Sequence, residues 1–209
     1  MTSATLATPD HDYTDVPNVL RGGLQLGILQ SAAVALYAIG SRMLSGPMET
    51  VVLALTLVAG VSATIALPGL WTRARKIEGI AGAAGIGLSA AGVFLVIDVA
   101  VVQPLGLYGN RWLAIGGGSN WWYHPVWWMV GTFMPWMGAW VLANQAAKSG
   151  SPNPIGLILG TLIGAAFVMA LASFAGFPGA AIGIGTFGVS VLPSLALNVL
   201  VSSFGARRA

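Results

Sequence analysis

The sequence has 209 residues, of which 56% are hydrophobic and only 7% are charged, and its formal net charge is +3. Because a soluble domain carries about 25% charged residues, this composition excludes an ordinary water-soluble protein and predicts a chain surrounded by lipid. The absence of cysteine excludes disulfides, zinc–thiolate sites, iron–sulfur clusters and thiol catalysis. The basic excess is too small to indicate nucleic-acid binding, and we assign it to membrane topology.

The first 20 residues differ from the rest of the chain. They contain Asp10, Asp12 and Asp15, no basic residue, and no short apolar core of the kind found in a signal peptide. We expect residues 1–20 to form a mobile cytoplasmic tail. Residues 21–206 are expected to form a single transmembrane bundle.

Six apolar segments follow the tail, each close to the length of about 20 residues that a helix needs to cross a bilayer. Pro68-Gly69 is expected to end the second segment, and only the short turn at Pro178-Gly179 divides the last two. The predicted fold is therefore an all-α polytopic membrane helix bundle. Its expected spans are residues 22–41, 51–67, 79–102, 125–147, 155–176 and 180–204.

The basic residues test this count, because they concentrate on the cytoplasmic side of membrane proteins. With six spans, Arg42 and Arg111 fall on one side and seven basic residues fall on the other. These seven are Arg21, Arg73, Arg75, Lys76, Lys148, Arg207 and Arg208. The bias predicts a multi-pass protein of the plasma or inner membrane, with both termini in the cytoplasm.

A long loop, residues 103–124, joins the third and fourth spans and is expected to face outward. Seven of the eight tryptophans fall between residues 112 and 140. Tryptophan favours the membrane–water interface, where its ring is in an apolar setting and its N–H meets polar groups. We expect this Trp-rich extracytoplasmic loop to lie in the outer interface.

Asp98 is the only acidic residue well inside a predicted span. An ionisable group in a membrane helix is costly and marks a functional site by default. Its position near the end of the third span places it close to the outer interface. Two interpretations are open: a structural ion pair with Arg42 or Arg111, or a carboxylate that handles protons or a ligand.

His124 is the only histidine outside the tail, and it follows Tyr123. It could be a hydrogen-bonding residue of the interface, an axial ligand to a pigment or haem, or a weak metal ligand together with Asp98. Tyr108, Arg111, Asn120 and Tyr123 are the further polar candidates around such a site. One histidine and one aspartate make a poor metal site alone, so we assign no metal and no cofactor.

Trp136, Trp140 and Met137 lie deeper in the fourth span, beside Pro135. An aromatic and methionine surface at a helix kink could contact a flat lipophilic cofactor such as a quinone or a pigment. The same side chains could instead fill the core of the bundle.

Gly156, Gly160 and Gly164 repeat every four residues in the fifth span. This spacing puts small residues on one face, so that another helix can approach closely. The partner could be a second copy of the chain, another subunit, or a helix of the same bundle.

Three functions follow from these features. The first is a non-catalytic subunit or scaffold of a larger membrane complex, with a lipophilic cofactor near its outer face. The second is a transporter or channel for a small solute or ion that uses Asp98. The third is a membrane enzyme with an outer site around Asp98 and His124. The expected partners are the lipid bilayer and other membrane subunits or further copies of the chain.

Overall fold

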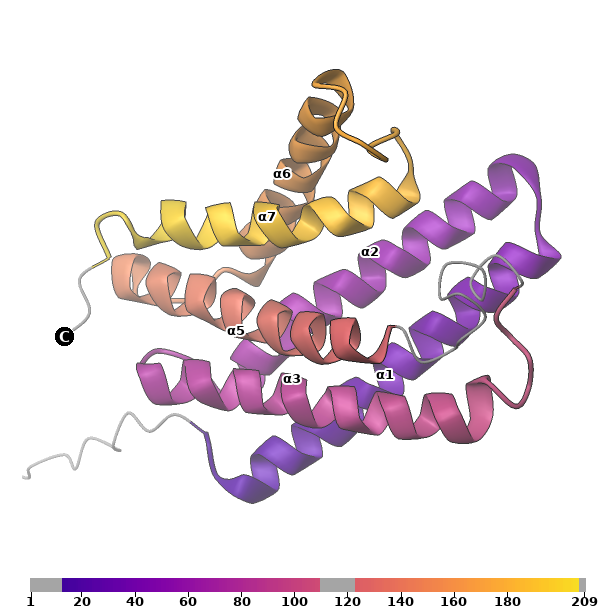
Figure 1. The fold of residues 1–209 in the computed structure, drawn as a ribbon. Coiled ribbons are helices and arrows are strands. Elements are labelled where there is room, and N and C mark those ends of the chain that lie inside the picture. Colours follow the sequence, from indigo (N-terminus) through magenta and orange to yellow (C-terminus); the bar gives the residue numbers. More distant parts are fainter. Residues whose placement is uncertain (1–12, 110–122, 207–209) are drawn as a thin grey trace, which may run out of the picture.

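The computed structural model describes residues 13–109 and 123–206, and every regular element in these ranges is helical (Figure 1). Six helices are long and apolar enough to cross a membrane, which confirms the predicted all-α bundle and its number of spans. The elements are α1 (Val16–Met43), α2 (Gly46–Trp71), α3 (Ile77–Ile97), the π-helix η1 (Asp98–Val102), α5 (His124–Ser149), α6 (Pro154–Phe174) and α7 (Ile184–Ser203).

The chain before α1 is bonded to the bundle. Asp15 caps α1 by accepting a hydrogen bond from the Asn18 N–H at 3.3 Å, so residues 16–20 of the predicted tail belong to the helix. The Tyr13 N–H donates to the Thr72 carbonyl at 3.0 Å, and the Arg73 guanidinium lies 4.7 Å from the centre of the Tyr13 ring. α1 therefore begins at Val16, before the predicted boundary at residue 20.

Two other predicted ends are corrected. α2 continues through Pro68 to Trp71, because a proline in a helix removes only one backbone bond, here the one to the Thr64 carbonyl. α7 begins at Ile184 rather than at residue 180. Gly176 and Gly179 adopt left-handed conformations, with φ of 67° and 78°, and the turns they make occupy the intervening chain.

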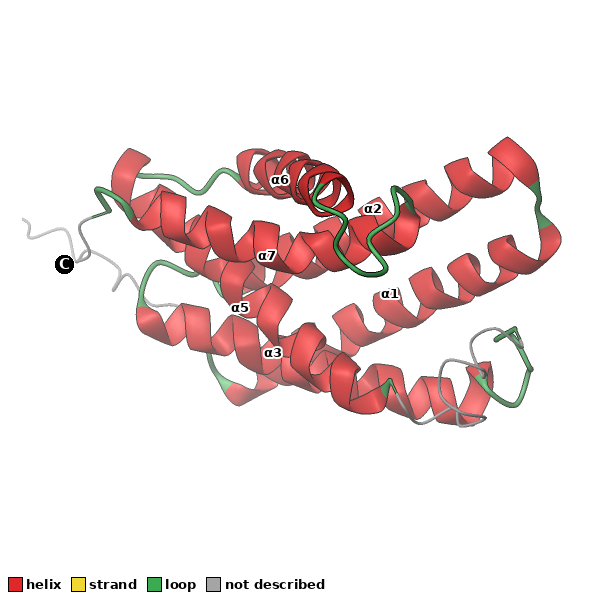
Figure 2. Cartoon of the chain, turned by 45° about the horizontal axis from the view of Figure 1, so that its top comes forward, coloured by secondary structure: helices red, strands yellow, loops and turns green. Residues whose placement is uncertain are grey.

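α5 lies in the middle of the bundle, in contact with α2, α3 and α7. α3 packs against both α1 and α5, and α7 packs against α5 and α6. In Figure 1, α1 and α2 cross the direction of α3 and α5 obliquely, while α6 rises steeply; Figure 2 also shows α6 and α7 away from α1 and α3. α1 begins and α7 ends at one end of the bundle, and η1 lies at the opposite end (Figure 1).

Glycines allow the closest helix contacts. A Cβ atom on Gly138 of α5 would lie 1.8 Å from the Ile65 carbonyl oxygen of α2, and one on Gly87 of α3 would lie 2.4 Å from the Gly131 carbonyl oxygen of α5. No side chain larger than hydrogen fits at such distances, so these helices touch through their backbones.

The predicted glycine repeat of α6 also packs inside the chain. A Cβ on Gly164 would lie 2.4 Å from Ser194 Oγ, and one on Gly160 would lie 3.2 Å from Asn198 Nδ2, both on α7. A Cβ on Gly156 would meet Asn153, the residue that caps α6. Of the alternatives, the structure therefore gives the repeat a partner helix in the same bundle.

Candidate functional site

Asp98 is the only charged side chain among the buried residues that the structure describes, and its exposed fraction is 0%. It is the first residue of η1, at the end of the span that α3 begins. A buried carboxylate is stable only when partners satisfy its oxygens. The identity of those partners therefore decides what Asp98 can do.

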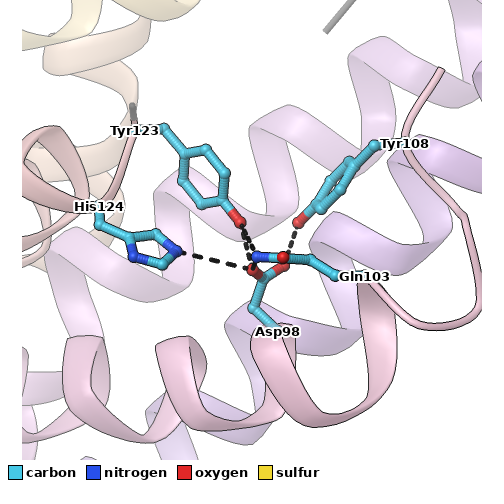
Figure 3. A network of polar contacts seen from close by, with 5 residues as sticks. All are labelled: Asp98, Gln103, Tyr108, Tyr123 and His124. Atoms are coloured by element: carbon cyan, nitrogen blue, oxygen red, sulfur yellow. Dashed lines mark hydrogen bonds and ion pairs between the residues drawn. The ribbon is translucent and has the colours of Figure 1, made fainter. Parts of the chain in front are cut away.

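Three neutral side chains donate hydrogen bonds to the Asp98 carboxylate (Figure 3). Gln103 Nε2 donates to Oδ2 at 2.6 Å, the Tyr123 hydroxyl donates to the same oxygen, and the Tyr108 hydroxyl donates to Oδ1. The rings of Tyr108 and Tyr123 meet edge to face, with centroids 6.0 Å apart. Among the described residues, both carboxylate oxygens are thus satisfied without a lysine or arginine.

The wide turn of η1 builds half of this arrangement. The Gln103 N–H bonds to the Asp98 carbonyl at 2.9 Å, the i to i+5 bond that defines a π-turn, and the Gln103 side chain returns to the carboxylate of the same residue. Pro104 follows and has no N–H to continue a helix. π-Turns inside α-helices occur frequently at functional sites.

His124 completes the set, which we call the Asp98 cluster: Asp98, Gln103, Tyr108, Tyr123 and His124. The Nε2 atom of His124 lies 3.9 Å from Asp98 Oδ2 (Figure 3), and the His124 side chain is 12% exposed. This distance is too long for a direct hydrogen bond but close enough for electrostatic interaction when the imidazole is protonated. The first turn of α5 therefore adds a titratable base beside the carboxylate.

The two tyrosine hydroxyls are held as donors. Burial, then the hydrogen bond to Asp98 and its negative charge, raise the pKa of Tyr108 well above the usual value of about 10. The same causes, in the same order, raise the pKa of Tyr123, although its contacts with Gln103 and Tyr108 oppose the shift. Both phenols therefore keep their protons throughout the neutral range.

The predicted ion pair of Asp98 with Arg42 is wrong. The Arg42 guanidinium donates to the Gly106 carbonyl instead, in the loop that carries Tyr108. Within the described part of the chain, the hydrogen-bond donors to the carboxylate are therefore neutral. The alternative partner, Arg111, lies outside the described residues, as does Asn120.

The aromatic surface predicted on α5 is divided by the fold. Met137 is 8% exposed and belongs to the core formed with α2, α6 and α7, and Trp140 packs against that core. Trp136 is 41% exposed, and its ring centroid lies 6.0 Å from that of Trp140. Of these three side chains, only Trp136 therefore presents a broad face to the surroundings of the bundle.

Gln103 is the site residue that the sequence analysis missed. An amide just beyond an apolar run is typical of a helix end, and the residue lies five positions after Asp98. Five residues separate Asp98 from Gln103, and this spacing brings their side chains together here through a π-turn, which the sequence alone does not reveal. Pro104, which favours a break in regular helical bonding, is the one signal in the sequence that points there.

The Asp98 cluster can support three kinds of chemistry: proton uptake and release, binding of a small cation or hydrogen-bonding solute, and acid–base catalysis with His124. Among the described residues, no group of three or more histidine, cysteine, aspartate or glutamate side chains is placed to hold a metal ion. No protein-family model matches the chain, and the searches of curated proteins and of solved structures returned no match. The site itself must therefore guide the choice among these functions.

Proposed function

We propose that this chain is a membrane transport protein that couples protonation of Asp98 to the movement of a small solute or ion. The observation that carries the proposal is a fully buried carboxylate whose three hydrogen-bond donors are all neutral. Among the described residues no lysine or arginine pairs with this ionisable group, and its hydrogen-bond partners are hydroxyl and amide groups. Intramembrane carboxylates of this kind serve proton relays in pumps and transporters.

The test is proton flux in vesicles that contain the purified protein and an internal pH indicator. We expect wild-type vesicles to respond to an imposed pH gradient and Asp98→Asn vesicles to behave like protein-free ones. Glu49→Gln is the matched control, because Glu49 lies in the first turn of α2 at the same end of the bundle, outside the Asp98 cluster. Equal flux in wild type and Asp98→Asn would refute the proposal.

We propose the orientation that the basic residues predict, with both termini in the cytoplasm and the Asp98 cluster near the outer face. The chain has no cysteine, so single-cysteine variants can be labelled against a clean background. Ser45 in the α1–α2 turn and Ser151 in the α5–α6 turn are both exposed. A membrane-impermeant maleimide should label Ser45→Cys but not Ser151→Cys in intact cells, and the reverse pattern would invert the orientation.

A subunit of a larger membrane complex, with a quinone or pigment near its outer face, is the second candidate. The exposed indole of Trp136 beside Trp140 favours it. Purification from native membranes in mild detergent, followed by an absorption spectrum, tests for a retained pigment or partner. Trp136→Leu should release such a ligand, whereas Trp128→Leu should not, although Trp128 is similarly exposed at 40%.

A further inference from the structure

The end of the bundle at which α1 begins carries most of the positive charge. In residues 13–109 and 123–206, this end has two exposed acidic side chains, Asp15 and Glu78, and five exposed basic ones. The basic residues are Arg21, Arg73, Arg75, Lys76 and Lys148. At the opposite end, the same ranges have one basic residue, Arg42, and two acidic residues, Glu49 and Asp98. The two ends therefore attract ions of different sign.

The connection between α2 and α3, residues 72–76, presents its basic side chains from a fixed backbone. Thr72 is 0% exposed and Ala74 is 4% exposed, and the Ala74 N–H donates at 2.9 Å to a carbonyl in the last turn of α2. Arg73 and Arg75 alternate with these two buried residues and are exposed. The fold of the connection therefore directs both guanidinium groups away from the core.

Arg75 joins this connection to the one between α5 and α6. Its Nη1 donates to the Gly150 carbonyl at 3.3 Å, and Gly150 caps the C-terminus of α5. Lys148 lies in the last turn of the same helix, two residues before Gly150. Cations from two distant parts of the sequence thus gather at one place, which we call the basic edge. It consists of Arg73, Arg75, Lys76 and Lys148.

The fold gives two members of the basic edge no counter-charge. In the described chain, no carboxylate lies within 4.0 Å of Arg73 or Lys148. The Arg73 guanidinium packs on the ring of Tyr13 instead, which is neutral. Exposed cations of this kind at the end of a membrane bundle attract the anionic headgroups of lipids.

Exposed apolar side chains lie directly beside the basic edge. Ile77 follows Lys76 and is 71% exposed, and Ile155, in the first turn of α6, is 68% exposed. Leu159 and Ile163 continue the exposed face of α6 at intervals of four residues. A water-soluble anion would satisfy only the cations, whereas a phospholipid carries both a phosphate and long apolar chains.

We propose that the basic edge binds the headgroup of an anionic phospholipid, with Arg75 and Lys148 on its phosphate and its acyl chains against Ile77 and along α6. A guanidinium presents several N–H donors in one plane, which suits two phosphate oxygens, and the ammonium of Lys148 adds a point charge. The inference goes beyond the proposed transport function and does not depend on it.

Native mass spectrometry of the full chain in mild detergent tests this binding, with phosphatidylglycerol and phosphatidylcholine of identical acyl chains as probes. We expect the wild type to retain phosphatidylglycerol in preference. Each cation near an anionic lipid surface contributes a factor of about five in affinity. Lys148→Gln should therefore lower the preference about fivefold, and Arg75→Gln together with Lys148→Gln should lower it at least about tenfold. Lys148→Arg, which keeps the charge, should retain it.

Arg42→Gln is the matched control. Arg42 is also an exposed arginine that donates to the carbonyl of a loop glycine, Gly106, but it lies at the opposite end of the bundle. We expect its lipid preference to equal that of the wild type. An equal loss in Arg42→Gln, or an unchanged preference in the double variant, would overturn the proposal.

A further arm separates a lipid from a soluble anion. Inorganic phosphate at the same concentration should not displace phosphatidylglycerol, because it lacks the acyl chains that contact Ile77 and α6. Complete displacement would overturn the lipid assignment in favour of a soluble phosphate. None of these measurements involves proton flux, so their outcome is separate from that of the transport assay.

Discussion

Two groups of buried polar side chains stabilise different parts of this bundle. The Asp98 cluster joins the end of α3 to the start of α5, and it contains a carboxylate, two phenols and an imidazole. A second group, the α6–α7 cluster, consists of Thr161, Ser194 and Asn198. There Ser194 Oγ donates to the Thr161 carbonyl at 2.7 Å, and Asn198 Nδ2 donates to the Thr161 hydroxyl at 3.2 Å.

The two clusters are similar in burial but differ in chemistry. No member of the α6–α7 cluster can change its charge, so its hydrogen bonds can only hold two helices together. The Asp98 cluster, by contrast, contains two ionisable side chains close together, the Asp98 carboxylate and the His124 imidazole. Polar groups in a membrane bundle thus indicate function when they are ionisable and lack a fixed counter-charge, and packing when they are not.

The largest expected effect comes from removing the shared acceptor of the Asp98 cluster. Asp98→Ala leaves the buried Tyr123 hydroxyl and the half-buried donors of Gln103 and Tyr108 without their carboxylate, and a buried donor without a partner costs about 1–3 kcal/mol. We expect the free energy of unfolding to fall by about 3 kcal/mol or more. Denaturant unfolding in mixed micelles measures this loss, and a decrease below about 1 kcal/mol would show that the cluster contributes little to the fold.

A smaller effect is expected from alkaline pH. Because folding raises the pKa of Tyr108 and Tyr123, their contribution to stability is complete below about pH 10, the pKa of an unfolded tyrosine, and is lost as the pH rises above it. The unfolding temperature of the wild type should therefore fall above about pH 10. The double variant Tyr108→Phe, Tyr123→Phe should lose less over the same range, and identical pH profiles would contradict this assignment.

The smallest effect is expected in the α6–α7 cluster. Asn198→Leu removes an interhelical hydrogen bond, and such bonds contribute about 0.6 kcal/mol on average in a membrane bundle. Unfolding measurements should detect a loss of this size, while proton flux should match that of the wild type. A loss of flux in Asn198→Leu would contradict the assignment of a packing role to the α6–α7 cluster.

The sequence located much of the Asp98 cluster because charges are so rare in this chain. A single carboxylate in a span and a single histidine beside a proline are easily recognised as candidate site residues. The structure brings Asp98, Tyr123 and His124 together. Of the two predicted partners of Asp98, Arg42 bonds a backbone carbonyl instead, which a rule based on opposite charges cannot anticipate. Gln103 was missed because the π-turn changes which residues share a helix face.

The ends of some helices were predicted incorrectly for a related reason. Pro68-Gly69 predicts a helix end in water, where the freed carbonyl is easily solvated, yet α2 continues through both residues to Trp71. In a membrane the alternative to a helix is an unbonded backbone, so a chain tolerates proline within a span. The number and type of elements followed from hydropathy and length, whereas their ends depended on contacts such as that of Tyr13 with Thr72.

The backbone contact between Gly138 and Ile65 restricts how this molecule can move. α2 and α5 meet there without intervening side chains, so any side chain at position 138 would force the two helices apart. α6, by contrast, buries only Leu157, Thr161 and Ala165. The transport function proposed above would therefore have to keep the α2–α5 contact closed, while most of the surface of α6 stays available to lipid or to another chain.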